Sequence, residues 1–419
     1  MPSKLSNLKK ETNLESEAKK DLKSLDILET RQQGCIEGVE DTTKLTQDEI
    51  LKHVPLITAE KAFSLDLKNG PFSVKYLRNG RHLLLYNSKG YISSFDVKSL
   101  NINFERNFEN EIYDSVYLHN ELFFSTAQKK NVFIYNNQGV EVHCCRDNRN
   151  VFKLEFLSFH FLLVSLSKDR ILRYQDTSTG KMIKEIFVKE NFKCMTQNKS
   201  NGIIFTGNDK GTVSLWSPNS KEYLTKVLCS KGNITSLEVE KNGNYFFTSS
   251  GLFLNFFDIR NFYKPMHSLK MNRNVKNVGL SDTNLLAVNL GRKIEIYKNI
   301  FTNPEKYLIH SDDYLINDLK FCPYEDILTL GTQNGIKNLV VPGCGDPIFD
   351  ALEESPFYTK TQRRELEIKK LLEKIPYTFI GQESLFNPQS KKIEESNKNF
   401  KRYFEKSKET PLERIFKKE

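Results

Sequence analysis

Between about residue 60 and residue 343, short runs of alternating apolar and polar residues are separated by clusters of Asn, Gly, Asp and Ser. Such alternation is typical of half-buried β-strands joined by tight turns, not of helices. One unit recurs along this stretch. A strand and a turn lead to a strongly apolar strand, then to a glycine-centred turn, and then to a strand that ends in an aromatic residue and a polar turn. The pattern predicts an all-β domain built from repeats.

Seven copies of this unit follow one another. They begin at Gly70, Ile112, Asn150, Cys194, Asn233, Asn274 and Leu315. A period of about 40 residues with four strands per unit is that of a WD40 propeller blade. Sheets stacked radially cover each other's faces, which one four-stranded sheet cannot do alone. We therefore predict a seven-bladed WD40 β-propeller over residues 56–343, closed by pairing of the strand at 61–67 with the last blade.

The signature residues of WD40 repeats are sparse in this chain. Trp216 is the only tryptophan, and no Gly-His pair opens a unit. The dipeptides that end the third strands read FD at Phe95 and Phe257 but YN at Tyr135. The prediction of a propeller therefore depends on the period and the strand pattern.

Residues 1–55 are predicted to form a charged, partly helical N-terminal arm, because they contain too few large apolar residues for a domain. One helix start is well marked within it. Thr46 and Glu49 form a capping box, and Leu45 and Ile50 form a hydrophobic staple. A short surface helix and a partner-binding helix both fit this pattern.

The repeat ends after Gly343, and residues 344–385 are predicted to contain an amphipathic helix. Thr359 and Gln362 form a second capping pair, and Pro376 ends the helical pattern. A candidate docking face consists of Ile368, Leu371, Leu372 and Ile375. We expect the opposite face to be basic and to contact a partner or RNA through Lys360, Arg363, Arg364, Lys369 and Lys370.

Residues 386–419 are predicted to form a basic tail that is disordered by itself, because it is charged throughout with only scattered aromatic residues. Lys401, Arg402 and Tyr403 are candidate RNA contacts, since cations bind phosphates and aromatic rings stack on bases. A solvated tail without a specific ligand fits the same residues.

Motifs for catalysis and cofactor binding are incomplete. Gly343–Asp346 begins like a dinucleotide fingerprint, but no third glycine follows and Pro347 interrupts it, so we predict a turn leaving the last blade. The runs GNDKGT and GTQNGI lack the ending of a phosphate loop and fit hairpin turns. His143, Cys144 and Cys145 have no second ligand pair that would complete a zinc site. We therefore predict no enzyme activity, no cofactor and no metal.

Composition narrows the class of protein further. The formal net charge of +9 favours acidic partners, RNA among them. The seven cysteines form no CxxC pair, and their odd number indicates reduced thiols in an intracellular protein. We expect neither a signal peptide nor a membrane span, because no run of about 18 apolar residues occurs.

Several stretches together resemble the family of WD repeat-containing protein 46, also known as U3 small nucleolar RNA-associated protein 7. They include KLTQDEI, NGRHLLLYNSKGYISSFD, GNDKGTVSLWSPN and FCPYEDILTLG, and the run VPGCGDPIFDALEESPFYTKTQRRELEIKKLLEKIP from Val341. The resemblance extends from about residue 26 to residue 385. Its last run is more specific than any single WD40 repeat.

This resemblance implies a structural assembly factor of the small-subunit processome, the U3-containing particle that processes pre-ribosomal RNA toward 18S ribosomal RNA. It further implies a nuclear and nucleolar location, a propeller that binds proteins, and extensions that contact processome proteins and pre-ribosomal RNA or U3 small nucleolar RNA. It implies neither a membrane nor a small-molecule substrate. A scaffold or adaptor of another nuclear complex, such as a ubiquitin ligase or a chromatin complex, is the alternative interpretation.

Overall fold

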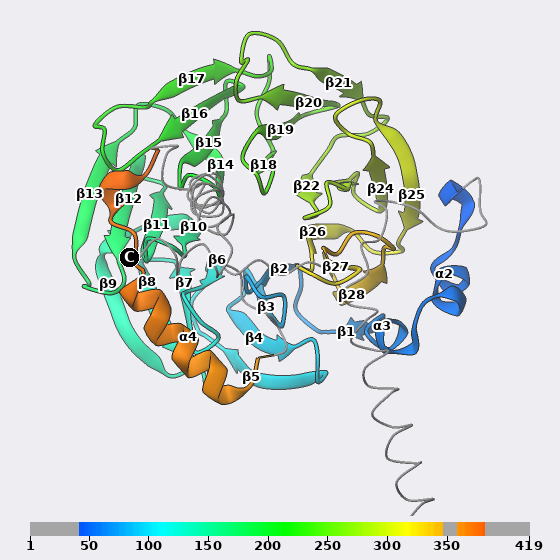
Figure 1. Cartoon of the computed structure of the whole chain (residues 1–419), viewed down its shortest axis with the longest axis horizontal. Helices are drawn as coiled ribbons and strands as arrows, with labels where there is room; N and C mark the ends of the chain where they lie inside the picture. Colours follow the sequence, from blue (N-terminus) through cyan, green and yellow to red (C-terminus); the bar gives the residue numbers. More distant parts are fainter. Residues whose placement is uncertain (1–41, 347–357, 382–419) are drawn as a thin grey trace, which may run out of the picture.

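The computed structural model describes residues 42–346 and 358–381. Seven four-stranded antiparallel sheets stand around a common axis and form a seven-bladed β-propeller (Figure 1). In six of these blades the strands follow one another in the sheet as they do in the sequence. The predicted fold class, an all-β seven-bladed WD40 propeller, is therefore confirmed.

The first four blades are each entered through their innermost strand. Blade 1 contains β2 (Phe72–Tyr76), β3 (His82–Asn87), β4 (Tyr91–Asp96) and β5 (Asn101–Asn107), and blade 2 contains β6 (Ile112–Tyr117), β7 (Phe123–Gln128), β8 (Asn131–Asn136) and β9 (Glu141–Arg149). Blade 3 contains β10 (Val151–Leu157), β11 (Leu162–Ser167), β12 (Ile171–Asp176) and β13 (Met182–Phe187), and blade 4 contains β14 (Phe192–Gln197), β15 (Ile204–Asn208), β16 (Thr212–Trp216) and β17 (Thr225–Leu228).

The remaining blades complete the ring. Blade 5 contains β18 (Ser236–Val239), β19 (Tyr245–Ser250), β20 (Phe253–Asp258) and β21 (His267–Lys270), and blade 6 contains β22 (Asn277–Leu280), β23 (Leu286–Asn289), β24 (Lys293–Lys298) and β25 (Glu305–Ser311). Blade 7 contains β26 (Ile316–Phe321), β27 (Ile327–Thr332), β28 (Gly335–Val340) and β1 (Ser64–Asp66). The runs GNDKGT and GTQNGI form the β15–β16 and β27–β28 turns, as predicted.

The ring is closed by β1, which pairs antiparallel with β28 as the outermost strand of blade 7. Ser64 lies opposite Lys337, and the carbonyl of Phe63 accepts a hydrogen bond from the N–H of Asn338 (2.8 Å). Two ends of the propeller sequence thus build one blade, which removes the open edge that a linear stack of sheets would leave. The predicted closing strand is confirmed.

The middle strands of each blade carry most of the apolar core. Every residue of β3 is buried, including the run Leu83–Leu85, whereas in the outermost strand β5 only Phe104 is buried. Both faces of an inner strand are covered because each blade lies between two others. Ile92 of blade 1 and Phe124 of blade 2 belong to one such cluster between blades. This explains why the second strand of each unit reads as a continuous apolar run.

A buried carboxylate joins three blades beside the central channel. Asp114 on β6 accepts hydrogen bonds from the N–H of Leu154 in blade 3 (2.9 Å) and from the hydroxyl of Tyr86 in blade 1 (2.8 Å). The Nζ of Lys75 lies 3.2 Å from the same carboxylate. Because Asp114 is fully buried, these partners replace the water that would otherwise solvate its charge.

Two ion pairs also cross the channel between blades that are not neighbours. Lys75 of blade 1 lies 3.5 Å from Glu155 of blade 3, and Lys320 of blade 7 pairs with Glu238 of blade 5. The channel is therefore spanned by paired charges contributed by the innermost strands.

The described segment before β1 packs against the last blades. It contains η1 (Thr42–Lys44), α2 (Gln47–His53) and α3 (Leu56–Glu60). In α2 the predicted capping box is confirmed, with the Glu49 carboxylate accepting from the N–H of Thr46 (3.0 Å). Gln47 exchanges hydrogen bonds with the backbone of Val340, and Ile50 is buried in the cluster of blades 6 and 7. This helix therefore binds its own propeller.

The chain leaves blade 7 through a tight turn, as predicted for Gly343–Asp346. Gly343 has a positive φ of 77°, and the N–H of Gly345 donates to the carboxylate of Asp326 (2.8 Å). The described chain then continues with α4 (Lys360–Leu372) and η2 (Tyr377–Phe379). None of the helices in the described ranges combines the length and the apolar character that a membrane crossing requires.

Candidate functional site

Residues 358–381, here called the C-terminal strap, run across one face of blades 1 to 4 (Figure 1). The strap begins with α4, whose predicted capping pair is confirmed. The N–H of Thr359 donates to the side-chain oxygen of Gln362 (2.9 Å), and the N–H of Gln362 donates to the Thr359 hydroxyl (3.4 Å). These bonds satisfy two backbone groups at the start of the helix, which fixes where α4 begins.

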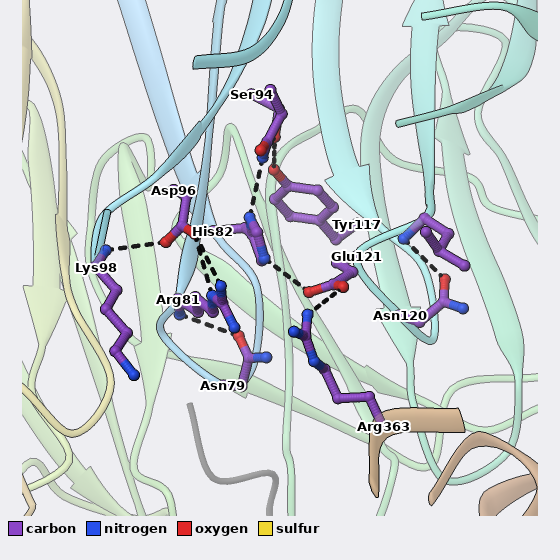
Figure 2. A network of polar contacts seen from close by, with 12 residues as sticks. Asn79, Arg81, His82, Ser94, Asp96, Lys98, Tyr117, Asn120, Glu121 and Arg363 are labelled. Carbon is purple, nitrogen blue, oxygen red and sulfur yellow. Dashed lines mark hydrogen bonds and ion pairs between the residues drawn. The ribbon is translucent and has the colours of Figure 1, made fainter. Parts of the chain in front are cut away.

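The first anchor of α4 is Glu121, in the turn between β6 and β7. Its two carboxylate oxygens bind the Arg363 guanidinium and the Nε2 of His82, the latter at 2.7 Å (Figure 2). The amide nitrogen of Asn103 lies 3.1 Å from Nδ1 of His82, so Nδ1 accepts from the amide and Nε2 donates to Glu121. One carboxylate therefore joins blade 1, blade 2 and α4.

Ionisation of Glu121 follows from these partners. Burial by itself raises the pKa of the Glu121 carboxyl, but the hydrogen bond from His82 and the nearby charge of Arg363 outweigh this effect and lower it. Glu121 is consequently ionised at neutral pH and holds Arg363 as a charged pair.

In the second anchor the carboxylate belongs to α4 and the hydrogen-bond donors belong to the propeller. Glu367 of α4 accepts hydrogen bonds from the Asn120 amide (2.9 Å) and from Nε2 of His119 (3.2 Å), both in the β6–β7 turn. Arg363 and Glu367 are four residues apart and therefore project from the same side of the helix. Polar residues of α4 thus face the propeller.

The segment after α4 is bound by blade 3. Lys374 pairs with Asp176 (2.5 Å) and also donates to the Ser178 hydroxyl (2.7 Å). The N–H of Ile375 donates to the carbonyl of Phe159 (3.0 Å), and the Ile375 carbonyl accepts from the ring Nδ1 of His160 (3.0 Å). Burial lowers the pKa of His160, so its ring is neutral at pH 7 and binds as a hydrogen-bond donor.

Blade 4 holds the end of the strap. The Asn219 amide donates to the Thr378 carbonyl (2.9 Å), and the N–H of Gly381 donates to the Asn201 carbonyl (3.1 Å). Ile380 is buried among apolar residues of blades 3 and 4. Anchors on three successive blades make the strap an integral part of this face.

The outer side of α4 is apolar. Ile368, Leu371 and Leu372 are 61%, 46% and 82% exposed, and we call these three residues the apolar ridge. An amphipathic helix on a globular protein normally buries its apolar stripe. In α4, by contrast, Arg363, Leu366 and Glu367 are half-buried, and the apolar ridge is exposed. Ile375, the fourth residue of the predicted docking face, is half-buried beside Phe159.

The predicted basic residues of α4 do not share one face, contrary to the expectation from the sequence. Arg363 is half-buried against Glu121, and Lys370 is half-buried as well. The other three, Lys360, Arg364 and Lys369, are exposed. Lys360 and Arg364 precede Ile368 at steps of four residues, so they lie on the same side as the apolar ridge. Lys401, Arg402 and Tyr403 lie outside the described residues.

A cavity of about 250 Å³ lies near the strap at the end of the central channel. Its lining includes Phe159 and His160, which bind the strap, and the channel residues Lys75, Glu155 and Lys320. In the ranges 42–346 and 358–381, no three His, Cys, Asp or Glu side chains are arranged to hold a metal ion. His143 and Cys144 lie on β9, at the outer edge of blade 2.

The residues that receive the strap carry no recognisable signal in the sequence. His119, Asn120 and Glu121 come from a turn whose run LHNEL indicates only that it is polar. Phe159 lies in the β10–β11 turn and Asp176 ends β12, both in blade 3. Their partners are about 200 to 250 positions away in the chain, as in the pair of Lys374 with Asp176. No local pattern carries such information.

We expect Glu121→Ala to loosen α4, because the variant leaves Arg363 without its carboxylate. A hydrogen bond between charged groups contributes about 1.5–3 kcal/mol, so amide exchange within α4 should accelerate at least about tenfold. Hydrogen exchange with mass spectrometry measures this directly. Glu141→Ala, at an exposed position on β9, is the matched control and should leave α4 unchanged; equal exchange in α4 for both variants would contradict the anchor.

The chain matches the model of the BING4CT (NUC141) domain over residues 306–383, which include strands β26 to β28 of blade 7 and the strap. It is 36% identical over 390 residues to WD repeat-containing protein 46 of Mus musculus, covering 90% of this chain and 62% of that protein. It is 38% identical over 346 residues to the protein of the same name from Caenorhabditis elegans, covering 81% and 59%.

A relative with a different name is similar to the same extent. U3 small nucleolar RNA-associated protein 7 of Saccharomyces cerevisiae is 37% identical over 364 residues, covering 82% of this chain and 66% of the yeast protein. The chain spans between 59% and 66% of the length of the relatives it matches. Both the propeller and the strap lie within the region of similarity.

Proposed function

Because this chain belongs to the family of WD repeat-containing protein 46 and U3 small nucleolar RNA-associated protein 7, we propose that it is a non-catalytic structural assembly factor of the small-subunit processome. In this role it acts in the nucleolus, on the path from pre-ribosomal RNA to 18S ribosomal RNA. The name of the yeast relative associates that protein with U3 small nucleolar RNA, and this association supports the proposal for the present chain.

The observation that carries a scaffolding role is the orientation of α4. Its polar side is occupied by Glu121, His119 and Asn120, so its apolar ridge faces solvent on a helix that cannot easily turn over. Burial of one leucine side chain is favourable by about 1.5–3 kcal/mol. An exposed ridge at i, i+3 and i+4 fits the way helices insert into apolar grooves of partner proteins. A neighbouring processome protein would supply that groove.

Direct RNA contact is the second part of the proposal. The exposed cations Lys360, Arg364 and Lys369 border the apolar ridge, and Lys401, Arg402 and Tyr403 in the tail suit phosphate binding and base stacking. Arg363 is excluded from this set, because its charge is used to position α4 against Glu121.

The chain divides into four parts in this proposal. An arm at residues 1–55 and the propeller at 56–343 precede the strap-containing segment at 344–385 and a basic tail at 386–419. The propeller provides a rigid platform, and the segments on either side of it reach neighbouring molecules.

Depletion of the protein is expected to lower mature 18S ribosomal RNA and to leave large-subunit RNA nearly unchanged. The physical reason is that loss of a scaffold prevents assembly of the particle on which 18S processing depends. Northern analysis after depletion, with the wild-type chain as rescue, measures the effect. Normal 18S levels, or absence of the protein from pre-ribosomal gradient fractions, would contradict the proposal and favour an adaptor of another nuclear complex.

A further inference from the structure

The face of the propeller opposite the strap carries a run of exposed cations over blades 2 to 4. Strands enter and leave this face through the β7–β8, β9–β10, β11–β12, β13–β14 and β15–β16 connections. Their exposed basic residues are Lys129, Lys130, Arg149, Lys168, Arg170, Lys189 and Lys210. We call these seven residues the basic ridge.

Backbone hydrogen bonds make the basic ridge continuous. The N–H of Asn150 donates to the carbonyl of Lys130 (3.0 Å), and the N–H of Lys168 donates to the carbonyl of Asn150 (2.9 Å). The N–H of Val188 then donates to the carbonyl of Arg170 (2.8 Å). The connections of blades 2 and 3 are therefore in direct contact. One of their cations is held in place by an aromatic ring, since the Nζ of Lys168 lies 3.7 Å from the centre of the Tyr113 ring.

Three acidic residues along the ridge have partners of their own. Asp169 accepts a hydrogen bond from the Asn150 amide (2.9 Å), Glu190 pairs with Lys226, and Asp209 pairs with Lys193 (3.2 Å). Among the described residues, none of the seven ridge cations forms an ion pair. Like charges held this close repel one another, so the ridge is a high-potential surface that a polyanion would stabilise.

An exposed aromatic ring lies within this cationic surface. Phe187, at the end of β13, is 76% exposed and pairs with Ile171, directly after Arg170. Lys189 follows two positions later. Exposing so much of a phenylalanine ring to water is unfavourable. Next to Arg170 and Lys189, this ring can stack on an unpaired base.

We propose that the basic ridge binds a single-stranded segment of RNA, with its cations on consecutive phosphates and Phe187 stacked on a base. The inference deepens the proposed function, on which it rests for the presence of RNA, and assigns RNA contact to the propeller itself. RNA is favoured over an acidic peptide because an aromatic ring amid phosphate-binding cations matches the alternation of phosphates and bases along a strand. Duplex RNA is not favoured, because its bases are stacked within the helix.

The test uses the full chain and a fluorescein-labelled single-stranded RNA of about 12 nucleotides and mixed sequence. Binding is followed by fluorescence anisotropy at KCl concentrations from about 50 to about 200 mM, which gives the salt slope. Each phosphate contact contributes about −0.7 to the slope of log K against log salt for single strands. Lys168→Ala with Arg170→Ala should therefore weaken binding about tenfold or more and make the slope shallower by about 1.4.

Phe187→Ala separates stacking from charge. Loss of one base–aromatic stack should weaken binding about tenfold with the salt slope unchanged. Lys221→Ala with Lys264→Ala is the matched control, since it removes two exposed cations from the β16–β17 and β20–β21 connections on the strap face. This control should bind RNA like the wild type.

Three outcomes would overturn the inference. The first is an equal loss of RNA affinity for the control pair. The second is unchanged RNA affinity for both the Lys168→Ala, Arg170→Ala variant and the Phe187→Ala variant. The third is binding of an acidic peptide in preference to RNA. If the ridge variants bind RNA normally while the chain still sediments with pre-ribosomal particles, the ridge assignment fails and the proposed function stands. If the ridge variants lose RNA binding as expected but depletion leaves 18S ribosomal RNA at its normal level, the ridge assignment stands and the proposed function fails.

Discussion

A chain carrying Leu371→Asp and Leu372→Asp is expected to lose its association with pre-ribosomal particles and to keep its melting temperature. Both side chains lie on the apolar ridge, 46% and 82% exposed, so an aspartate at either position remains solvated in the free protein. In a partner groove each would carry an unpaired charge into an apolar site. Loss of two leucine contacts at about 1.5–3 kcal/mol each weakens binding at least about a hundredfold.

Sedimentation of the tagged variant through a density gradient measures the association, and thermal denaturation followed by circular dichroism measures the stability. Leu228→Asp is the matched control, because this leucine is 68% exposed on β17 at the rim of blade 4. The control should remain in the particle fractions. A large fall in melting temperature for the double variant would show that the apolar ridge stabilises the protein itself instead.

Asp114→Ala is expected to lower the free energy of unfolding by about 3–5 kcal/mol, the usual cost of removing one partner from a buried ion pair. The variant leaves Lys75 without its nearest carboxylate and leaves the N–H of Leu154 and the hydroxyl of Tyr86 without their acceptor. These groups belong to blades 1 and 3, and Asp114 belongs to blade 2 between them, so the variant weakens the junction of three blades. Urea denaturation measures the change.

Asp169→Ala removes an exposed carboxylate and is the control, with an expected change within about 0.5 kcal/mol. A loss below about 1 kcal/mol for Asp114→Ala would contradict the bridging role.

The same carboxylate predicts a dependence of stability on pH. Burial by itself raises the pKa of Asp114, but Lys75, Lys153 and the hydrogen bonds outweigh it, so the pKa is lowered in the folded state. A lowered pKa gives stability that is complete above the ordinary value of 3.8 and is lost as the pH falls through the folded-state value. Below pH 3.8 the wild type should therefore lose its advantage over Asp114→Ala.

The propeller and the starts of the helices on either side of it could be predicted from local patterns in the chain. A period near 40 residues, the apolar run Leu83–Leu85 and its counterparts, and the capping pairs at Thr46 and Thr359 each reflect interactions between residues close in sequence. The closing strand was also predictable, because a ring of sheets needs a partner at its last edge.

The orientation of α4 was not accessible in this way. Its apolar residues indicated a docking face, and the usual rule would place them against the propeller. Arg363 and Glu367 reverse that outcome, because Glu121, His119 and Asn120 offer them charged and polar partners in a turn more than 200 positions away. The basic ridge has the same origin, since its cations come from turns that only the stacking of blades 2 to 4 brings together.

The amino-acid sequence by itself determined the repeat, the number of blades, the helix starts and the family, because each depends on short-range periodicity or on a contiguous motif. The tertiary structure alone decided which side of α4 faces solvent and which cations form one surface. Those features depend on contacts between residues far apart in the chain. The stacking of the blades and the docking of the strap on them set these contacts, and no local pattern encodes them.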